Sequence, residues 1–197
     1  MTTPKTLTKN DLMSLDDYAA VRDELRRANV ALKKPRRIAV GPDATFYFEN
    51  HATMKQQVLE MLYIEKGGDE QVEDELQAYN PMIPQGQELT ATLMFEINDE
   101  VRRGHVLRQL TDVELTAYVQ LGDDKVFAKP EQEVERTAPD GKTSSVHFLH
   151  FQFPAELIAK FAAPDTQIVL GFGHENYTHM TVLTAASKAS LFADFDA

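Results

Sequence analysis

The segment ELTATLMFEI, residues 88–97, carries its side chains in two alternating sets. Every second residue is apolar: Leu89, Ala91, Leu93, Phe95 and Ile97. The intervening residues are mostly polar, and successive side chains of a β-strand point to opposite faces of its sheet. The segment is therefore predicted to be a half-buried strand, which requires a sheet with at least one face against a core.

The segments around this strand mix helical and strand patterns. Helical spacing marks residues 14–34, 51–66, 69–79, 98–110, 154–163 and 187–195, and strand or hairpin patterns mark 36–50, 115–128, 145–153, 166–174 and 178–185. The first helix is the best defined, because Ser14 and Asp17 come close to a capping box and Pro35 ends it. Residues 129–144 are predicted to form an exposed polar loop.

No strict strand–helix–strand repeat runs through these elements. Their order predicts an α+β fold, a mostly antiparallel sheet with helices packed on one face. We expect a single domain over residues 1–197, with an N-terminal helical arm at 1–35 and an α+β core at 36–197.

Composition excludes several classes of function. The formal charge is −11, from 31 acidic against 20 basic residues, which argues against general nucleic-acid binding and against docking on anionic membranes. The absence of cysteine excludes disulfides, thiolate metal sites and cysteine nucleophiles. The N-terminal residues lack the apolar core of a signal peptide, and no apolar run is long enough to span a membrane, so we expect a cytoplasmic protein.

Two histidines are predicted to point toward the core. In SVHFLHFQF, His147 shares its strand face with Leu149, Phe151 and Phe153, whereas His150 lies on the mixed face. In TQIVLGFGH, His174 extends an apolar face just past the strand. A buried imidazole needs partners for both ring nitrogens, which either hydrogen bonds or a divalent metal can supply.

Carboxylates from the helix at 51–66 are candidates to join these histidines. Glu65 falls near an apolar helix face, and Glu60 flanks the same groove. Together with His147 and His174 they could surround iron, zinc or manganese, all of which accept nitrogen and oxygen ligands. The alternative is that Glu65 pairs with an arginine and Glu60 faces solvent. No catalytic motif of the G-x-S-x-G, H-E-x-x-H or phosphate-loop type is present, so enzymatic activity stays undecided.

Six segments together resemble the bacterial family named domain of unknown function 3501. They are LTKNDLMSLDDYAAVR, GPDATFYFEN, MKQQVLEMLYIEK, ELQAYNPMIP, LTATLMFEI and KTSSVHFLHF. The similarity extends from about Leu7 to Tyr177, and the family pattern includes Gln57, Glu60, Met61, Glu65, Tyr79-Asn80-Pro81, His147 and a His174–Tyr177 pair. Departures from the pattern occur at Asp43, His150, Gly173 and Glu175.

The resemblance implies a setting rather than an activity. Members of the family tend to be encoded beside rubrerythrin-like proteins and iron–sulfur oxidoreductases, which implies an accessory role in peroxide or electron-transfer chemistry. The leading hypothesis is a metal-binding accessory protein with His147, His174, Glu60 and Glu65 as ligands and Tyr177 supporting them from outside the coordination sphere. Its partner would be a rubrerythrin-like or iron–sulfur redox protein.

Two other hypotheses stay open. In the first, the chain is a non-catalytic interaction module and its histidines and glutamates form a structural hydrogen-bond network. The acidic segment Asp69–Glu75, or the basic end of the first helix, would then contact the partner. In the second, a small molecule binds in a pocket beside Tyr79-Asn80.

Overall fold

The computed structural model describes residues 5–131 and 141–196. Most of the predicted polar loop at 129–144 lies outside the described residues. The six helices of the described part are α1 (Leu15–Lys33), α2 (His51–Glu65), α3 (Gly68–Tyr79), α4 (Glu100–Arg108), α5 (Ala155–Ala162) and α6 (Ala185–Phe192). None of them combines the length and the apolar character needed to cross a membrane.

The strands form two antiparallel sheets. The first has the order β1-β2-β3-β7-β6, from β1 (Arg37–Val40), β2 (Ala44–Glu49), β3 (Glu88–Phe95), β7 (Val146–Gln152) and β6 (Lys129–Pro130). The second has the order β5-β4-β8-β9, from β5 (Asp124–Phe127), β4 (Ala117–Leu121), β8 (Ile168–Phe172) and β9 (Met180–Val182). The predicted α+β class with antiparallel pairing is confirmed.

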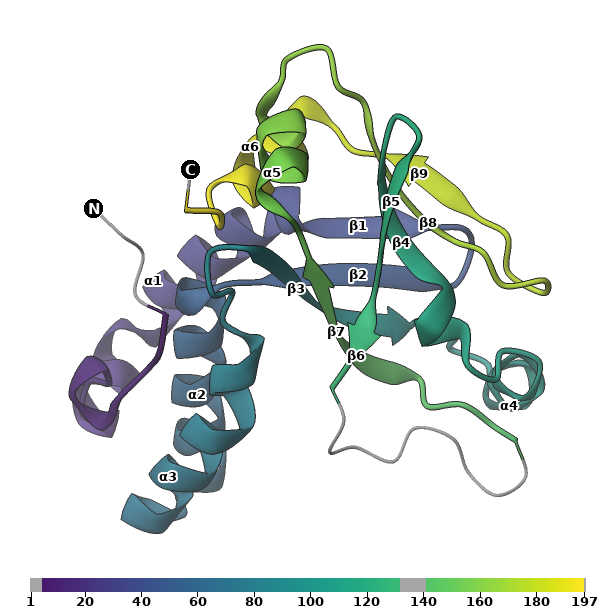
Figure 1. Cartoon of the computed structure of the whole chain (residues 1–197). Coiled ribbons are helices and arrows are strands. Elements are labelled where there is room, and N and C mark those ends of the chain that lie inside the picture. Colours follow the sequence, from purple (N-terminus) through teal and green to yellow (C-terminus); the bar gives the residue numbers. More distant parts are fainter. Residues whose placement is uncertain (1–4, 132–140, 197) are drawn as a thin grey trace.

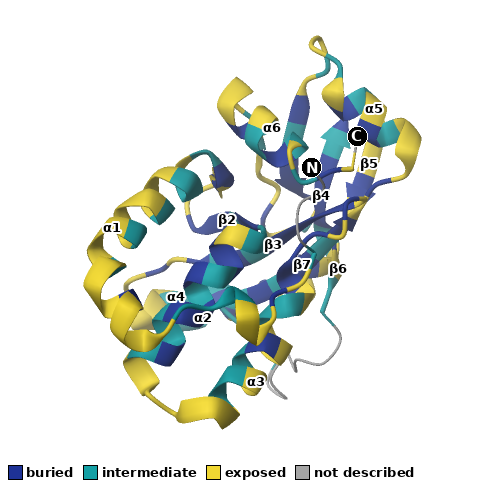
Figure 2. Cartoon of the chain, turned by 90° about the vertical axis from the view of Figure 1, so that its left-hand side faces the viewer, coloured by how far each residue is buried: buried dark blue, intermediate teal, exposed yellow. Residues whose placement is uncertain are grey.

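The main core lies between the two sheets. Alternate residues of the first sheet, including Phe46, Leu93 and Phe151, pack with residues of the second sheet such as Leu170 and Phe172 in one buried cluster. The register pairs Leu93 with His147, so these two side chains share the core face. Figure 2 shows the strands of this region as mostly buried.

Helices α2 and α3 cover part of the opposite face of the first sheet. Met54, Val58 and Leu76 form a second buried cluster, against which Phe148 of β7 packs. Because Phe148 and His147 are neighbours on a strand, their side chains point to opposite faces. The predicted packing of helices on one face of the sheet is therefore confirmed, and the second sheet covers the other face. In Figure 1, α1, α2 and α3 lie together, away from β8 and β9.

Local sequence signals explain where the main helices begin. The Ser14 side chain accepts a hydrogen bond from the Asp17 amide at the start of α1. At the start of α2, Asn50 and Thr53 form a reciprocal capping box. Helix α1 is largely exposed (Figure 2), and its buried residue is Tyr18, which faces α2. The N-terminal helix is thus present and rests on α2.

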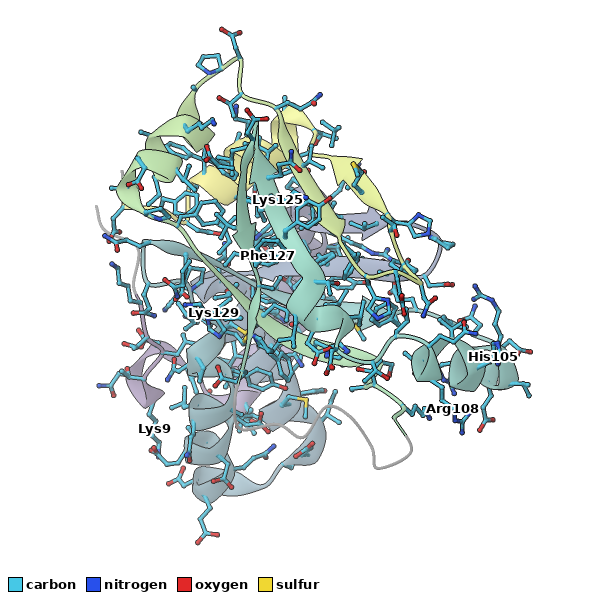
Figure 3. All side chains as sticks on the ribbon, turned by 45° about the vertical axis from the view of Figure 1, so that its right-hand side comes forward. Lys9, His105, Arg108, Lys125, Phe127 and Lys129 are labelled. Atoms are coloured by element: carbon cyan, nitrogen blue, oxygen red, sulfur yellow. The ribbon has the colours of Figure 1, made fainter. Side chains whose placement is uncertain are left out.

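The outer face of the second sheet points away from both cores. Lys125 and Phe127 of β5 project from this face in Figure 3, and Phe127 is 53% exposed. The Lys125 ammonium lies 4.0 Å from the centre of the Tyr118 ring, a cation–π contact across β4 and β5.

Candidate functional site

His147 lies where the strand pattern predicts, on the core face of β7. It is 1% exposed, and its Nε2 lies 2.9 Å from the carbonyl oxygen of Ser144. Its Nδ1 lies 3.7 Å from Oε2 of Glu114, which is also buried. The predicted inward orientation of His147 is confirmed, and the carboxylate beside it comes from Glu114, which sequence analysis had not singled out.

His174 does not extend the core face, so that prediction is wrong. It follows the end of β8 and forms an isolated bridge with Tyr177. Its Nε2 donates to the carbonyl oxygen of Thr111 at 3.1 Å, and its Nδ1 accepts from the amide of Asn176 at 3.2 Å. Both ring nitrogens of His174 therefore form hydrogen bonds with backbone groups of loops. β8 ends at Phe172, two residues before His174, so the alternation of the strand no longer sets the direction of this side chain.

The two glutamates of α2 lie on the helical side of the first sheet. Glu60 accepts hydrogen bonds from the Tyr18 hydroxyl at 2.5 Å and from Arg22 at 3.0 and 2.8 Å. The Arg22 hydrogen bond, followed by that of Tyr18, holds the pKa of Glu60 below its usual value. Glu65 ends α2 in an exposed position and accepts from Gln71 at 2.9 Å, so its predicted place near an apolar face is wrong.

The structure does not bring the four predicted ligands together. His147 faces the core between the sheets, whereas Glu60 faces α1 beyond the opposite face of the first sheet. Within residues 5–131 and 141–196, no three His, Asp or Glu side chains are close enough to hold one metal ion. Metal binding by any of these residues singly or in a pair stays a prediction.

Tyr177 is buried against the turn between β1 and β2. Its hydroxyl donates to the carbonyl oxygen of Val40 at 2.9 Å and accepts from the amides of Asp43 and Ala44 at 3.0 and 2.9 Å. Burial raises the pKa of this hydroxyl above its usual value. The turn is held a second time by Arg102, which binds the Asp43 carboxylate through two hydrogen bonds of 2.7 and 2.8 Å. Tyr177 thus supports a hairpin.

A cleft lies between the helical side of the first sheet and helices α1 to α3. Its volume is about 540 Å³. Its lining is apolar at Met54, Met94, Val146 and Phe148, and it carries polar groups at Lys33, Tyr47, Glu49, Tyr79 and Glu96. Tyr79 precedes Asn80-Pro81, so the cleft lies beside the step where a small-molecule pocket was one of the hypotheses.

Glu49 is the functional candidate that sequence analysis missed. It ends β2, and its side chain is 4% exposed in the cleft wall. One carboxylate oxygen, Oε1, accepts a long hydrogen bond of 3.3 Å from Thr92. The other, Oε2, has no hydrogen-bond partner among the described residues, and Lys33 Nζ lies 3.6 Å away. The alternation of the strand could have identified this residue. Phe46 and Phe48 point into the core, so the Glu49 side chain has to point to the opposite face of the sheet, toward the helices.

Comparison with known proteins places this fold in a family. The crystal structure of a novel protein of unknown function from Burkholderia pseudomallei K96243, at 1.90 Å resolution, is 34% identical in sequence. The similarity covers 97% of this chain and 100% of that chain, with a TM-score of 0.90. No curated protein matches. The profile described as Protein of unknown function (DUF3501) matches residues 6–195, and the chain therefore belongs to this family, as its sequence motifs had indicated.

Proposed function

We propose that this chain is a ligand-binding accessory protein, and that its ligand occupies the cleft between the first sheet and helices α1 to α3. The observation that carries the proposal is the cleft itself. Its volume of about 540 Å³ falls within the range of small-molecule sites, and it combines apolar walls with a few convergent polar groups. Met94, Val146 and Phe148 are only half-buried there, although they lie on a sheet face.

Three of the residues predicted to form a metal site have contacts that suit a structural role instead. His174, Glu60 and Tyr177 direct their polar atoms to neighbouring backbone or side chains. These contacts hold a loop, a helix pair and a hairpin, and they support a structural role for these three residues, as in the alternative hypothesis. The cleft lies apart from His174 and Tyr177, so binding and structural support are separate.

A test of this proposal is to fill the cleft. Benzyl alcohol serves as a neutral probe, and its binding is measured by ligand-observed NMR. Met94→Trp should abolish the binding because the larger side chain occupies the cleft, while Val21→Trp on the exposed side of α1 should leave it unchanged. Equal binding to both variants, or no binding to the wild type, would refute the proposal.

Divalent-metal binding is a second candidate, favoured by one observation. The buried His147 Nδ1 lies 3.7 Å from a carboxylate oxygen of Glu114, and this donor pair suits iron, zinc or manganese. Two protein ligands are fewer than the three or four of most zinc sites. Metal analysis of protein purified without an affinity tag decides it: about one metal per chain, lost in His147→Ala, supports this candidate, and wild type without metal eliminates it.

We propose the redox setting for either candidate on the family resemblance alone. The partner would be a rubrerythrin-like or iron–sulfur protein. Calorimetric titration of the purified chain with such a partner tests it, and the absence of heat at both low and high salt would contradict it. The charge of −11 makes a salt-sensitive association the expected result.

A further inference from the structure

We infer that the cleft binds a small organic cation, an amine or similar donor on an apolar body, and that Glu49 pairs with its charged head. This inference rests on the ligand-binding function proposed above and specifies the class of ligand. It is drawn from the hydrogen bonding of one buried carboxylate, from the lysine beside it and from the aromatic walls of the cleft.

The Glu49 carboxylate has too few hydrogen bonds for its burial. A carboxylate can accept about four hydrogen bonds, and buried polar atoms in folded proteins nearly always have a partner. Within the described residues, Glu49 accepts one side-chain hydrogen bond, at 3.3 Å from Thr92, and none at Oε2. Its carbonyl oxygen has a partner, since it accepts from Arg36 at 3.0 Å. The shortfall therefore lies on the side chain, which faces the cleft.

Lys33 covers this carboxylate without forming a hydrogen bond to it. Its Nζ lies 3.6 Å from Oε2, beyond normal hydrogen-bond length. Lys33 is the last residue of α1, and its side chain is 27% exposed, so its flexible stem can swing toward solvent. We interpret the Lys33 ammonium as a cation that occupies the position of the ligand's charged group in the free protein. It would move away when the ligand binds.

The walls of the cleft suit a cation more than an anion. The rings of Tyr47, Tyr79 and Phe148 line it, and aromatic faces attract ammonium and guanidinium groups. A second carboxylate, Glu96, lies in the same lining. Hydrogen bonds from Thr45 and then Tyr47 lower the pKa of Glu96, so it stays ionised at neutral pH. Glu96 already pairs with Arg37 at 3.1 Å, so the carboxylate that an anion would meet without a hydrogen-bonded cation is that of Glu49.

The test uses three probes of nearly the same shape: benzylammonium, benzyl alcohol and benzoate. Their dissociation constants are measured by NMR titration at pH 7 on the full chain. Benzylammonium should bind the wild type about tenfold more tightly than benzyl alcohol, the value of one charged hydrogen bond, and benzoate should bind more weakly still. Equal affinities for the three, or a preference for benzoate, would overturn the inference.

Two variants assign the preference to residues. Glu49→Gln should remove the advantage of benzylammonium and leave benzyl alcohol binding unchanged. Lys33→Met should increase benzylammonium affinity several-fold because the competing ammonium is gone, whereas an anion site would lose affinity in that variant. A preference that survives in Glu49→Gln would overturn the role of Glu49. Thermal unfolding confirms that each variant is folded.

The outcomes separate this inference from the proposed function. Binding of benzyl alcohol that is abolished by Met94→Trp, without any preference for benzylammonium, supports the ligand-binding function and overturns the cation assignment. If no probe binds, or if Met94→Trp binds all three as the wild type does, both the function and the inference fall.

Discussion

At the scale of single residues, the Tyr177 hydroxyl fixes the β1–β2 turn through three backbone contacts. It donates to Val40 and accepts from Asp43 and Ala44. Tyr177→Phe would leave these buried groups without a partner, so we expect a loss of about 1–3 kcal/mol in the free energy of unfolding. Denaturant titration measures it. Tyr47→Phe, which removes a hydroxyl bound to a surface carboxylate, should cost less, and equal losses would contradict the argument.

His150 is predicted to make stability depend on pH. Its Nδ1 lies 3.1 Å from Glu88 and its Nε2 lies 3.1 Å from Glu131. The Glu88 hydrogen bond is the largest of the effects that raise the pKa of His150 above its ordinary value of 6.5. A raised pKa in the folded state means that the stabilisation is fully present below about pH 6.5 and is lost as pH rises through the folded pKa.

The measurement compares the unfolding free energies of wild type and His150→Gln between pH 6 and 9. The difference should be largest at pH 6 and shrink toward pH 9. Val101→Ala, at an exposed position of α4 that does not titrate, is the control and should show no such trend. A difference between wild type and His150→Gln that stays constant over this range would rule out the proposed charge pairing.

At the scale of elements, the β1–β2 hairpin depends on a glycine with a left-handed backbone. Gly41 has φ +72°, and a Cβ there would lie 2.6 Å from the His179 ring and 2.8 Å from the Tyr177 hydroxyl. Gly68 has φ +76°, and a Cβ there would meet no described atom within 4 Å. The two positions therefore share the same backbone penalty and differ in the space available.

Substitution by alanine should separate these two effects. Gly68→Ala should lower the free energy of unfolding by about 1–2 kcal/mol, the penalty of a left-handed residue. Gly41→Ala should lower it by at least about 1 kcal/mol more, because the methyl group displaces the Tyr177 hydroxyl from the turn. Denaturant titration of both variants is the measurement. Equal losses would show that the contact with Tyr177 does not limit this turn.

At the scale of the whole molecule, Arg36 joins the N-terminal and C-terminal parts of the chain. Its guanidinium donates to the carbonyl oxygens of Phe48, Glu49 and Ser190, and it pairs with Asp194, 158 residues away. Both charged side chains are buried. Through these hydrogen bonds, one buried guanidinium ties the end of β2 to α6.

Removal of this arginine should destabilise the fold far more than removal of its neighbour. Arg36→Met leaves Asp194 buried and unpaired, so we expect a loss of about 3–5 kcal/mol. Arg37→Met breaks a pair with Glu96 in which the side chains are 56% and 37% exposed, and should cost about 0–1 kcal/mol. Thermal and chemical unfolding compare the two. Replacing Asp194 by Leu in the Arg36→Met background should recover part of the loss; no recovery would argue against an unpaired charge as its cause.

The sequence by itself determined the features that follow from local periodicity. Alternation on β7 placed His147 toward the core and His150 on the opposite face, as observed. The capping pattern at Ser14 located the start of α1. These predictions succeed because side-chain direction in a regular strand, and the hydrogen bonds at a helix end, depend on residues adjacent in the chain.

Tertiary structure alone decided which side chains share a site. Glu65 and His174 follow the regular pattern in the sequence, yet one ends a helix in solvent and the other lies past Gly173 in a loop. Glu49 became the candidate binding residue because α1 brought Lys33 over it while β3 supplied one long hydrogen bond. The burial of a side chain and the number of its hydrogen-bond partners depend on segments far apart in the chain. Local periodicity does not determine which of these segments come into contact.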